Sequence, residues 1–326
     1  MKILVTGATG FVGSSLVEKM VKDRHEVTVL SRQPRSMANL KRLKVTLSYA
    51  SFNEPDTLKR AVRGKEIIFH LAGLINAPRE LLHLYRQANV LTTRNLLRAA
   101  DRSVLRAFVY CSSVAVYGQL KNPPADEKTP LSPDNLYGQS KYEAEKVCLD
   151  FFKKEKLPVS IVRPTWIYGP RDRRTFKLFK AINKGTFAII GDGKIRIHPL
   201  FIYDLVNAFK LCAFDEKAAG KIFLVGGEET LDLNNLVSLI AKALGRSSPR
   251  LHIPLKLAKS GAFALENLYR PFGKKPPLSR RRLEFFTRNQ QFNISRAHRE
   301  LSFKPEYGLP EGINLTVNWY RKEGWL

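Results

Sequence analysis

The first thirteen residues, MKILVTGATGFVG, constrain the fold more than any other stretch of this chain. Residues 3–5 form a short apolar run with β-branched members, which predicts a buried strand, and an amphipathic run begins at Phe11. A glycine turn between a strand and a helix brings backbone N–H groups and a helix N-terminus against a pyrophosphate. We therefore expect a dinucleotide site in which Gly7 permits the tight turn, Gly10 admits the phosphate and Gly13 lets the helix pack closely.

Length and cysteine content bound the class of protein. A chain of 326 residues can bury a large core, so we expect one large domain or two intimate ones. No apolar run is long enough to cross a membrane, and Met1 leads straight into the first predicted strand without room for a signal peptide. Three cysteines at wide spacing indicate a reducing compartment, with neither a disulfide framework nor a metal site. We expect a cytoplasmic protein.

The net charge is strongly positive, because 55 lysines and arginines stand against 29 acidic residues and give +26. Such a balance favours acidic partners, which include nucleic acid, anionic lipid and phosphorylated substrates. The alternative interpretation is a generally basic, solvated surface. No nucleic-acid motif accompanies the charge, and aromatic residues are not interleaved with it, so no specific nucleic-acid partner is expected.

The first half of the chain alternates predicted strands and helices, a pattern typical of an α/β fold with a doubly wound parallel sheet. Helices are expected over 11–23, over 54–63, around 87–97 and from Tyr137 onward. The expected strands lie at 3–5, 26–30, 45–49, 66–70, 107–110, 159–162 and 221–225.

The residues after the second strand favour NADP(H) over NAD(H). The adenosine ribose lies at this strand end, where an acidic side chain would bind a free 2′-hydroxyl and repel a 2′-phosphate. This chain has no carboxylate there and instead reads Ser31-Arg32-Gln33-Pro34-Arg35. Arg32, with help from Ser31 and Arg35, can pair with a phosphate through charged, forked hydrogen bonds.

A serine pair at a predicted strand end, Ser112-Ser113, precedes a tyrosine and a lysine at helical spacing. Tyr137 and Lys141 are four residues apart, so they share one face of a helix. A carbonyl that receives a hydride becomes an alkoxide and needs a proton, which a phenol can supply when a cation stabilises its phenolate. We expect Tyr137 to be the acid–base and Lys141 to lower its pKa and to hold the nicotinamide ribose.

These motifs resemble the extended branch of the short-chain dehydrogenase/reductase superfamily, the NAD-dependent epimerase/dehydratase superfamily. The resemblance is carried by the G-x-x-G-x-x-G spacing, by HLAG at 70–73 and by R-P-x-x-x-Y-G-P at 163–170. It implies that Ser113 is the catalytic serine that binds the substrate oxygen, with Ser112 in reserve, and that Asn89 organises a water relay. It also implies that the dinucleotide contacts Gly7, Thr9, Gly10, Phe11, Val12, Gly13, Leu71, Ala72, Gly73, Lys141, Pro164 and Ile167, besides Arg32 and Arg35.

Two departures from the family pattern bear on specificity. Ser51-Phe52 replaces an Asp-Leu pair whose acid contacts adenine, which weakens that contact. Trp166 stands where nucleotide-sugar epimerases and dehydratases commonly carry an asparagine that binds the sugar nucleotide. Trp166 makes the substrate pocket more apolar, or it belongs to the core.

The nearest likeness within the branch is to the hydroxysteroid dehydrogenase and dihydroflavonol-reductase-like group. It implies an NADP(H)-dependent reductase or dehydrogenase acting on a ketone or secondary alcohol of an apolar substrate that is steroid-, lipid- or flavonoid-like. One alternative is a nucleotide-sugar epimerase or dehydratase. A non-enzymatic alternative is a cofactor-bound structural or accessory subunit. A homodimer through the helix that bears Tyr137 is also implied.

The expected organisation is a dinucleotide-binding domain over 1–165 with 200–226 returning to it, and a small substrate-binding region over 166–199 and 227–326. Asp204, at the start of a predicted helix, is expected to be an N-cap or a local ion-pair partner.

Residues 246–282 hold ten lysines and arginines and one acid, and 255–268 have apolar residues at helical spacing. Such a helix either lies on an anionic membrane or serves as a domain lid with its charges in water.

Overall fold

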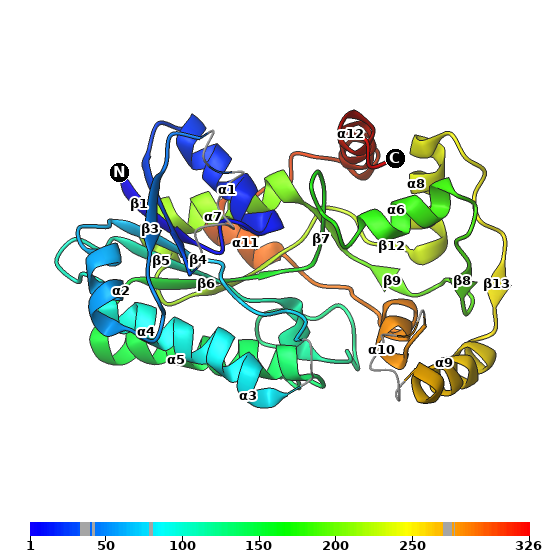
Figure 1. Ribbon diagram of the computed structural model, residues 1–326, viewed down its shortest axis with the longest axis horizontal. Coiled ribbons are helices and arrows are strands. Elements are labelled where there is room, and N and C mark those ends of the chain that lie inside the picture. The colour runs from blue at the N-terminus through cyan, green and yellow to red at the C-terminus, as the bar shows by residue number, and fades with distance from the viewer. Residues whose placement is uncertain (33–39, 41–42, 78–80, 270–275, 277) are drawn as a thin grey trace.

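The computed structural model describes residues 1–32, 40, 43–77, 81–269, 276 and 278–326. Within these residues, seven parallel strands form one sheet in the order β11-β6-β5-β4-β1-β2-β3 (Figure 1). The strands are β1 (Lys2–Thr6), β2 (Glu26–Ser31), β3 (Thr46–Tyr49), β4 (Ile67–His70), β5 (Ala107–Cys111), β6 (Val159–Pro164) and β11 (Ile222–Val225).

The strand order reverses between β1 and β4, because the chain leaves β1 toward β2 and β3 and then crosses back to β4. Thr6 and His70 are register partners at the carboxyl ends of these two neighbouring strands. In an open parallel sheet, the crevice outside such a switch point is where ligands bind. The predicted doubly wound sheet is confirmed, and its switch point lies directly beside the glycine turn.

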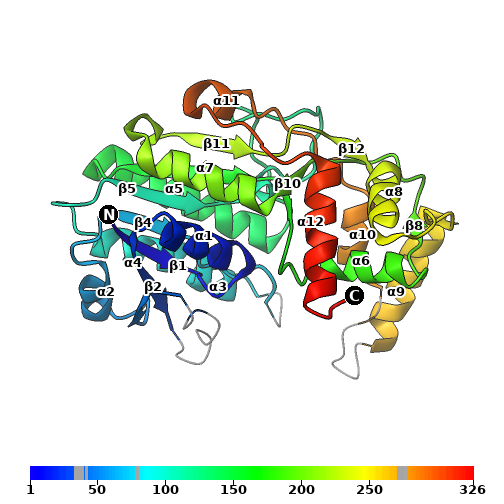
Figure 2. The ribbon, with the colours of Figure 1, turned by 90° about the horizontal axis from the view of Figure 1, so that it is seen from above.

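Helices cover both faces of the sheet (Figures 1 and 2). Successive strand residues point to opposite faces, so Ile3 and Val5 join one core and Leu4 joins the other. The first core is closed by α1 (Phe11–Lys22), α7 (Ile202–Phe214) and α11 (Ser295–Leu301). The second core is closed by α2 (Pro55–Val62), α4 (Thr92–Ala99) and α5 (Leu136–Glu155).

The helix predicted around 87–97 is irregular. The chain forms α3 (Leu82–Tyr85), then a π-helical turn, η2 (Arg86–Leu91), and only then α4. A π-turn widens the backbone ladder locally and is common where a side chain serves a site. A further short helix, η3 (Val114–Tyr117), follows β5.

A smaller lobe lies beyond the carboxyl end of the sheet (Figure 2). Its core is built on α6 (Phe176–Asn183), α8 (Leu233–Leu244) and α12 (Leu309–Lys322). A second layer is made by α9 (Leu255–Tyr269), α10 (Arg280–Leu283) and η5 (Glu284–Phe286). The other elements are the strand pairs β7 (Trp166–Tyr168) with β10 (Pro199–Phe201), β9 (Arg196–Ile197) with β12 (Leu231–Asp232) and β8 (Ile189–Ile190) with β13 (His252–Ile253), and the short helix η4 (Glu216–Ala218).

The prediction that Asp204 caps α7 is wrong, although the residue is structural as expected. The N-cap of α7 is Phe201, and Asp204 lies inside the first turn, where its Oδ1 accepts the backbone N–H of Glu306 at 2.7 Å. It therefore ties the C-terminal segment to α7 rather than capping the helix.

Among the described helices, none is long and apolar enough to cross a membrane.

Candidate active site

The glycine turn has the geometry that a bound pyrophosphate needs. Gly7 has φ +71°, and a Cβ there would lie 2.6 Å from the backbone nitrogen of Ala72. A Cβ on Gly13 would overlap the Gly7 carbonyl oxygen, so the helix packs as closely as expected. The Gly10 N–H donates to Gly7 O at 3.0 Å, and α1 begins at the next residue with no acid in its first turn. The open N–H groups of this helix end fit an anionic phosphate.

A cavity of about 1480 Å³ opens above the glycine turn. Pockets for one drug-sized ligand span roughly 300–1,000 Å³, so this one has room for a dinucleotide and a second molecule. Arg35 lies outside the described residues, and Asn89 is buried behind the wall. The other predicted site residues all line it: Gly7, Thr9, Gly10, Phe11, Val12, Gly13, Arg32, Leu71, Ala72, Gly73, Ser113, Tyr137, Lys141, Pro164, Trp166 and Ile167.

Tyr137 enters the cavity from the first turn of α5. The N-cap of this helix is Asn135, whose side chain accepts the Gly138 N–H at 2.9 Å and fixes where the helix starts. Burial, with a smaller contribution from Cys111, raises the pKa of Tyr137 to about 12, and Ser113 offsets part of the rise. The phenol is therefore held in its protonated form.

Lys141 follows Tyr137 one helical turn later and is almost fully buried. Its Nζ donates to the Cys111 carbonyl oxygen at 2.7 Å and lies 4.7 Å from the centre of the Tyr110 ring. Burial lowers the pKa of this ammonium group. Desolvation of the phenol dominates the pKa of Tyr137, and the Lys141 ammonium donates to a backbone carbonyl. That Lys141, together with the positive nicotinamide, stabilises the phenolate stays a prediction.

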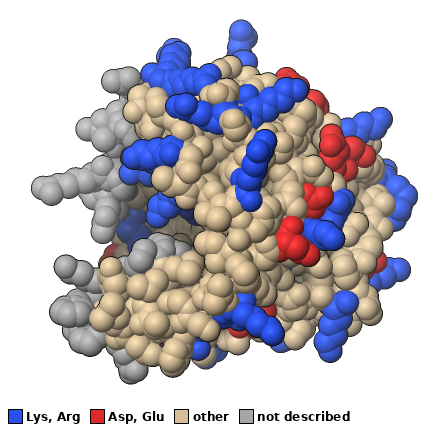
Figure 3. Space-filling view, turned by 90° about the vertical axis from the view of Figure 1, so that its right-hand side faces the viewer, with Lys and Arg blue, Asp and Glu red and all other residues tan. Residues whose placement is uncertain are grey.

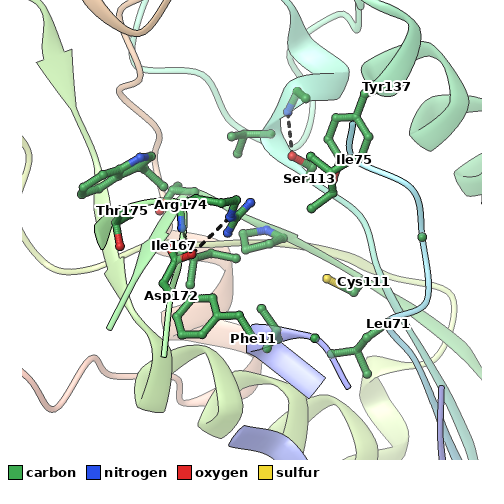
Figure 4. Close-up of a pocket in the computed structure, with 18 of the residues that line it drawn as sticks. Phe11, Leu71, Ile75, Cys111, Ser113, Tyr137, Ile167, Asp172, Arg174 and Thr175 are labelled. Carbon is green, nitrogen blue, oxygen red and sulfur yellow. Dashed lines mark hydrogen bonds and ion pairs between the residues drawn. The ribbon is translucent and has the colours of Figure 1, made fainter. Parts of the chain in front are cut away.

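The two serines after β5 have different surroundings. Ser112 is buried and its hydroxyl donates to Glu145 Oε1 at 2.5 Å. Ser113 caps η3 by accepting the Ala115 N–H at 3.1 Å, which leaves its own hydroxyl proton for another acceptor (Figure 4). The geometry thus favours Ser113 over Ser112 as the serine that meets a substrate oxygen.

Asn89 lies on the π-helical turn and joins three parts of the site. Its Oδ1 accepts the Leu74 N–H at 2.6 Å, and its Nδ2 donates to Leu74 O and to Ser140 Oγ at 3.0 and 2.8 Å. A Cβ on Gly73 would meet both Asn89 Oδ1 and Lys141 Nζ, at 3.0 and 3.4 Å. Asn89 therefore fixes the loop after β4 against the start of α5, and the water relay stays a prediction.

A buried histidine beneath the cavity was not anticipated from the sequence. His70 Nδ1 contacts Thr6 Oγ1 at 2.7 Å, and its Nε2 contacts Thr93 Oγ1 at 2.9 Å. Thr93 donates to Asn89 O, so it accepts from Nε2–H, and Thr6 donates to Nδ1 while accepting the Ala72 N–H. Burial lowers the pKa of His70 to about 3, which keeps it neutral. This network ties the glycine turn to the 71–73 turn.

The far wall of the cavity combines aromatic and cationic side chains. Trp166 stacks on Tyr168 with ring centres 5.9 Å apart and lies 6.1 Å from Phe285, so it belongs to both the core and the cavity wall. Arg174 lies across the cavity from Ser113 and Tyr137 and is paired with Asp172 at 3.3 Å (Figure 4). The further cationic side chains in the lining are Arg32, Lys141, Arg171, Arg173, Lys177 and Arg288.

No specific sequence signal marks these arginines, because in a chain of charge +26 a basic run is typical of a solvated surface. A positional signal did exist, since 171–177 directly follow the R-P-x-x-x-Y-G-P motif. Among the described residues, no group of three histidine, cysteine or acidic side chains is placed to hold a metal ion.

Comparisons with known proteins identify the family and agree with the fold. The model of the NAD dependent epimerase/dehydratase family matches residues 3–226. The N-acetyl-alpha-D-glucosaminyl-diphospho-ditrans,octacis-undecaprenol 4-epimerase of Escherichia coli O157:H7 is 28% identical over 97% of this chain and 94% of its own. A 3-beta-hydroxysteroid dehydrogenase of Mycolicibacterium neoaurum is 26% identical over 98% and 91%. The solved UDP-glucuronic acid 4-epimerase of Bacillus cereus, in complex with NAD, superposes with a TM-score of 0.79 at 22% identity, covering 99% of both chains.

Proposed function

Because the chain belongs to the NAD dependent epimerase/dehydratase family, whose members are NAD(P)-dependent enzymes acting on CH–OH groups, we propose that it transfers a hydride between NADP(H) and a ketone or secondary alcohol. The observation that carries the proposal is the convergence of Ser113, Tyr137 and Lys141 on one cavity above the glycine turn. The nicotinamide, when bound, supplies or accepts the hydride.

Side chains of the cavity orient the substrate and transfer the proton. The Ser113 hydroxyl donates to the substrate oxygen and orients it. Tyr137, held as a neutral phenol with a pKa raised to about 12 by burial, gives its proton to the alkoxide as it forms. Arg174 supplies positive charge from across the cavity that lowers the pKa of Tyr137, and Lys141 adds positive charge one helical turn from the phenol; both stabilise the phenolate that remains. In the oxidative direction the same groups act in reverse.

The choice of NADP(H) rests on Arg32. This residue follows the last residue of β2 and lines the cavity beside Leu30, Ser31 and Phe52, on the side where an adenosine ribose would lie. A guanidinium at this point suits a 2′-phosphate. The Bacillus cereus enzyme was solved with NAD, and the cofactor preference of an Arg32→Asp variant tests the proposed use of NADP(H) by this chain.

The substrate is proposed to be apolar and steroid-, lipid- or flavonoid-like. Support comes from the aromatic wall, in which Trp166 and Phe285 meet, and in which Phe187 stacks on Phe286 at 6.1 Å. The likeness to a 3-beta-hydroxysteroid dehydrogenase points in the same direction. An aromatic surface of this kind favours flat or hydrocarbon groups.

A second candidate is a 4-epimerase of a sugar diphosphate. It is favoured by the cationic side chains Arg173, Arg174 and Lys177, which line the same cavity and suit a diphosphate. The likeness to the Escherichia coli epimerase adds support, since its named substrate joins a sugar diphosphate to a long lipid. Both candidates use the same Ser113 and Tyr137 chemistry, and they differ in whether the dinucleotide is consumed.

One experiment separates them. The purified protein is weighed in native form to identify the retained dinucleotide, and is then assayed with NADPH against apolar ketones and with sugar diphosphates for interconversion of 4-epimers. Net NADPH oxidation by an apolar ketone supports the reductase. Epimer interconversion without net oxidation supports the second candidate.

Tyr137→Phe serves as the negative variant, and Tyr142→Phe, the same change on the same helix, serves as its control. Tyr142 faces Lys146, whose Nζ lies 4.1 Å from its ring centre, rather than the cavity. We expect Tyr137→Phe to lose about 10²- to 10⁴-fold in kcat while dinucleotide binding is retained. Comparable activity in both variants would overturn the proposed role of Tyr137.

A further inference from the structure

We propose that the outer face of α9, together with Leu251, is a docking surface for an anionic lipid bilayer. Across the described chain, four large hydrophobic side chains are more than half exposed: Leu251 (62%), Leu257 (66%), Phe263 (56%) and Leu268 (61%). All four lie within one stretch of eighteen residues. The next most exposed large hydrophobic residue, Tyr49, reaches 48% and lies on the far strand β3.

The helix is apolar on two sides. Its inner face buries Ala258 and Ala262 against Leu283 and Ile190, which anchors it to the smaller lobe. Leu257 and Leu268 are eleven residues apart, just over three full turns, so both lie on one edge of the opposite face. A surface helix that only packs against a core normally carries polar residues on its outer face. The exposed leucines therefore indicate that this face of α9 contacts a partner.

The charges around the exposed hydrophobic residues of α9 indicate that the partner is anionic. Lys256 and Lys259 lie on the outer face among the exposed hydrophobic residues, and residues 246–282 hold ten basic residues against one acid. That acid, Glu266, is paired with Arg280 at 2.8 Å. Lys and Arg also predominate over Asp and Glu on the face seen in Figure 3, which is the side of the molecule that carries α9 and β13.

Apolar side chains set among cations match a bilayer with anionic headgroups, because the leucines enter the acyl boundary while the lysines reach the phosphates. A stable anchor needs two signals, and this surface supplies both hydrophobic and electrostatic ones.

The position of α9 links this surface to the cavity. Leu283 and Phe286 pack against the inner side of α9, and Phe286 also lines the cavity wall. Phe286 thus joins the side chains packed beneath α9 to the aromatic wall of the cavity. On the proposed function, docking would place that end beside the bilayer, where lipid-like substrates reside.

The test is cosedimentation of the full-length protein with lipid vesicles. Because it has no activity readout, its result does not depend on whether the proposed reaction is correct. Vesicles of phosphatidylcholine alone are compared with vesicles that also contain phosphatidylglycerol. We expect binding to the anionic vesicles that weakens with added salt, and a loss of at least about tenfold in Leu257→Ser/Leu268→Ser and in Lys256→Glu/Lys259→Glu.

Two controls separate docking from adsorption of a basic protein. Leu315→Ser replaces an exposed leucine on α12, and Lys153→Glu/Lys154→Glu makes the same charge change at the far end of α5. Docking through α9 predicts that these controls bind within about twofold of the parent. Equal losses in both sets, or no binding to anionic vesicles, would overturn the proposal. So would a change of oligomeric state in the α9 variants, which would make a second copy the partner.

Discussion

Arg163 and Glu145 form a two-pronged ion pair beneath the active site, with Nε–Oε1 and Nη2–Oε2 distances of 2.9 and 2.7 Å and both side chains 2% exposed. The same carboxylate accepts the Ser112 hydroxyl, and Arg163 Nη1 donates to the Tyr117 hydroxyl at 2.7 Å. The pair therefore fixes β6, α5 and the segment after β5 relative to one another. The segment it fixes is the one that carries Ser113.

Glu145→Gln should destabilise the fold by about 3–5 kcal/mol, because it leaves a buried guanidinium without its counter-charge. Glu143→Gln is the matched control on the same helix. Glu143 pairs with Arg86 at 2.9 Å at the surface, and its loss should cost less than about 1 kcal/mol. Urea unfolding of the two variants measures the difference, and equal costs would contradict the assigned role of the buried pair.

Ser113→Ala and Ser112→Ala should have opposite signatures. Ser113→Ala should lower kcat by about 10²- to 10³-fold, since it removes the donor to the developing alkoxide, and should cost about 1 kcal/mol of unfolding free energy through the lost cap of η3. Ser112→Ala should keep most of the activity and lose about 1.5–3 kcal/mol of unfolding free energy, because it removes a hydrogen bond to a charged group. Steady-state kinetics and denaturation of both variants show which serine is catalytic and which is structural. A catalytic defect confined to Ser112→Ala would reverse the assignment.

Arg32→Asp should move the cofactor preference from NADPH toward NADH. A charged hydrogen bond to phosphate contributes about 1.5–3 kcal/mol, so the ratio of kcat/KM for NADPH to that for NADH should fall by about 10- to 100-fold. Arg60→Asp makes the same charge change on the surface of α2, outside the cavity lining, and should leave the ratio unchanged. An unchanged ratio in Arg32→Asp would remove the argument for NADP(H).

The parts of this protein that could be predicted from sequence are those with a local pattern. Gly7 and Gly13 were predicted because a turn and a close helix approach can be inferred from a few adjacent residues. Tyr137 and Lys141 were predicted to share a face because helical spacing is local. The parallel sheet followed from alternating apolar runs, since strands buried on both faces are continuously hydrophobic.

The buried polar networks could not be predicted in this way. His70 meets Thr6 only because β4 lies beside β1 in register, and it meets Thr93 only because the π-helical turn brings α4 over the sheet. Glu145 and Arg163 are joined by the packing of α5 on β6. Such contacts depend on the tertiary arrangement, and hydrophobic periodicity reports only which face of an element is buried.

Asp204 gives a prediction with a definite pH dependence. The side chain is 1% exposed, Oδ1 accepts the Glu306 N–H, and among the described residues Oδ2 has no hydrogen-bond partner. Burial raises the pKa of Asp204 from its ordinary value of 3.8 to about 6, and the neighbouring carboxylates Glu306 and Glu311 add to the rise. Because the folded state holds the proton more tightly than the unfolded state, stability is greatest below about pH 4 for this group and falls as the pH rises to about 6.

Asp204→Asn should remove that loss, since the amide oxygen can still accept the Glu306 N–H and carries no charge. The variant should match the parent near pH 4 and exceed it by up to about 3 kcal/mol above pH 6, because each unit of pKa shift corresponds to about 1.4 kcal/mol. Asp192→Asn makes the same substitution at an exposed turn, where the carboxylate accepts the Lys194 N–H, and serves as the control for the change of side chain. Urea unfolding at several pH values measures both. A difference between Asp204→Asn and the parent that does not grow from pH 4 to 6 would show that this carboxyl group titrates alike in the folded and unfolded chains.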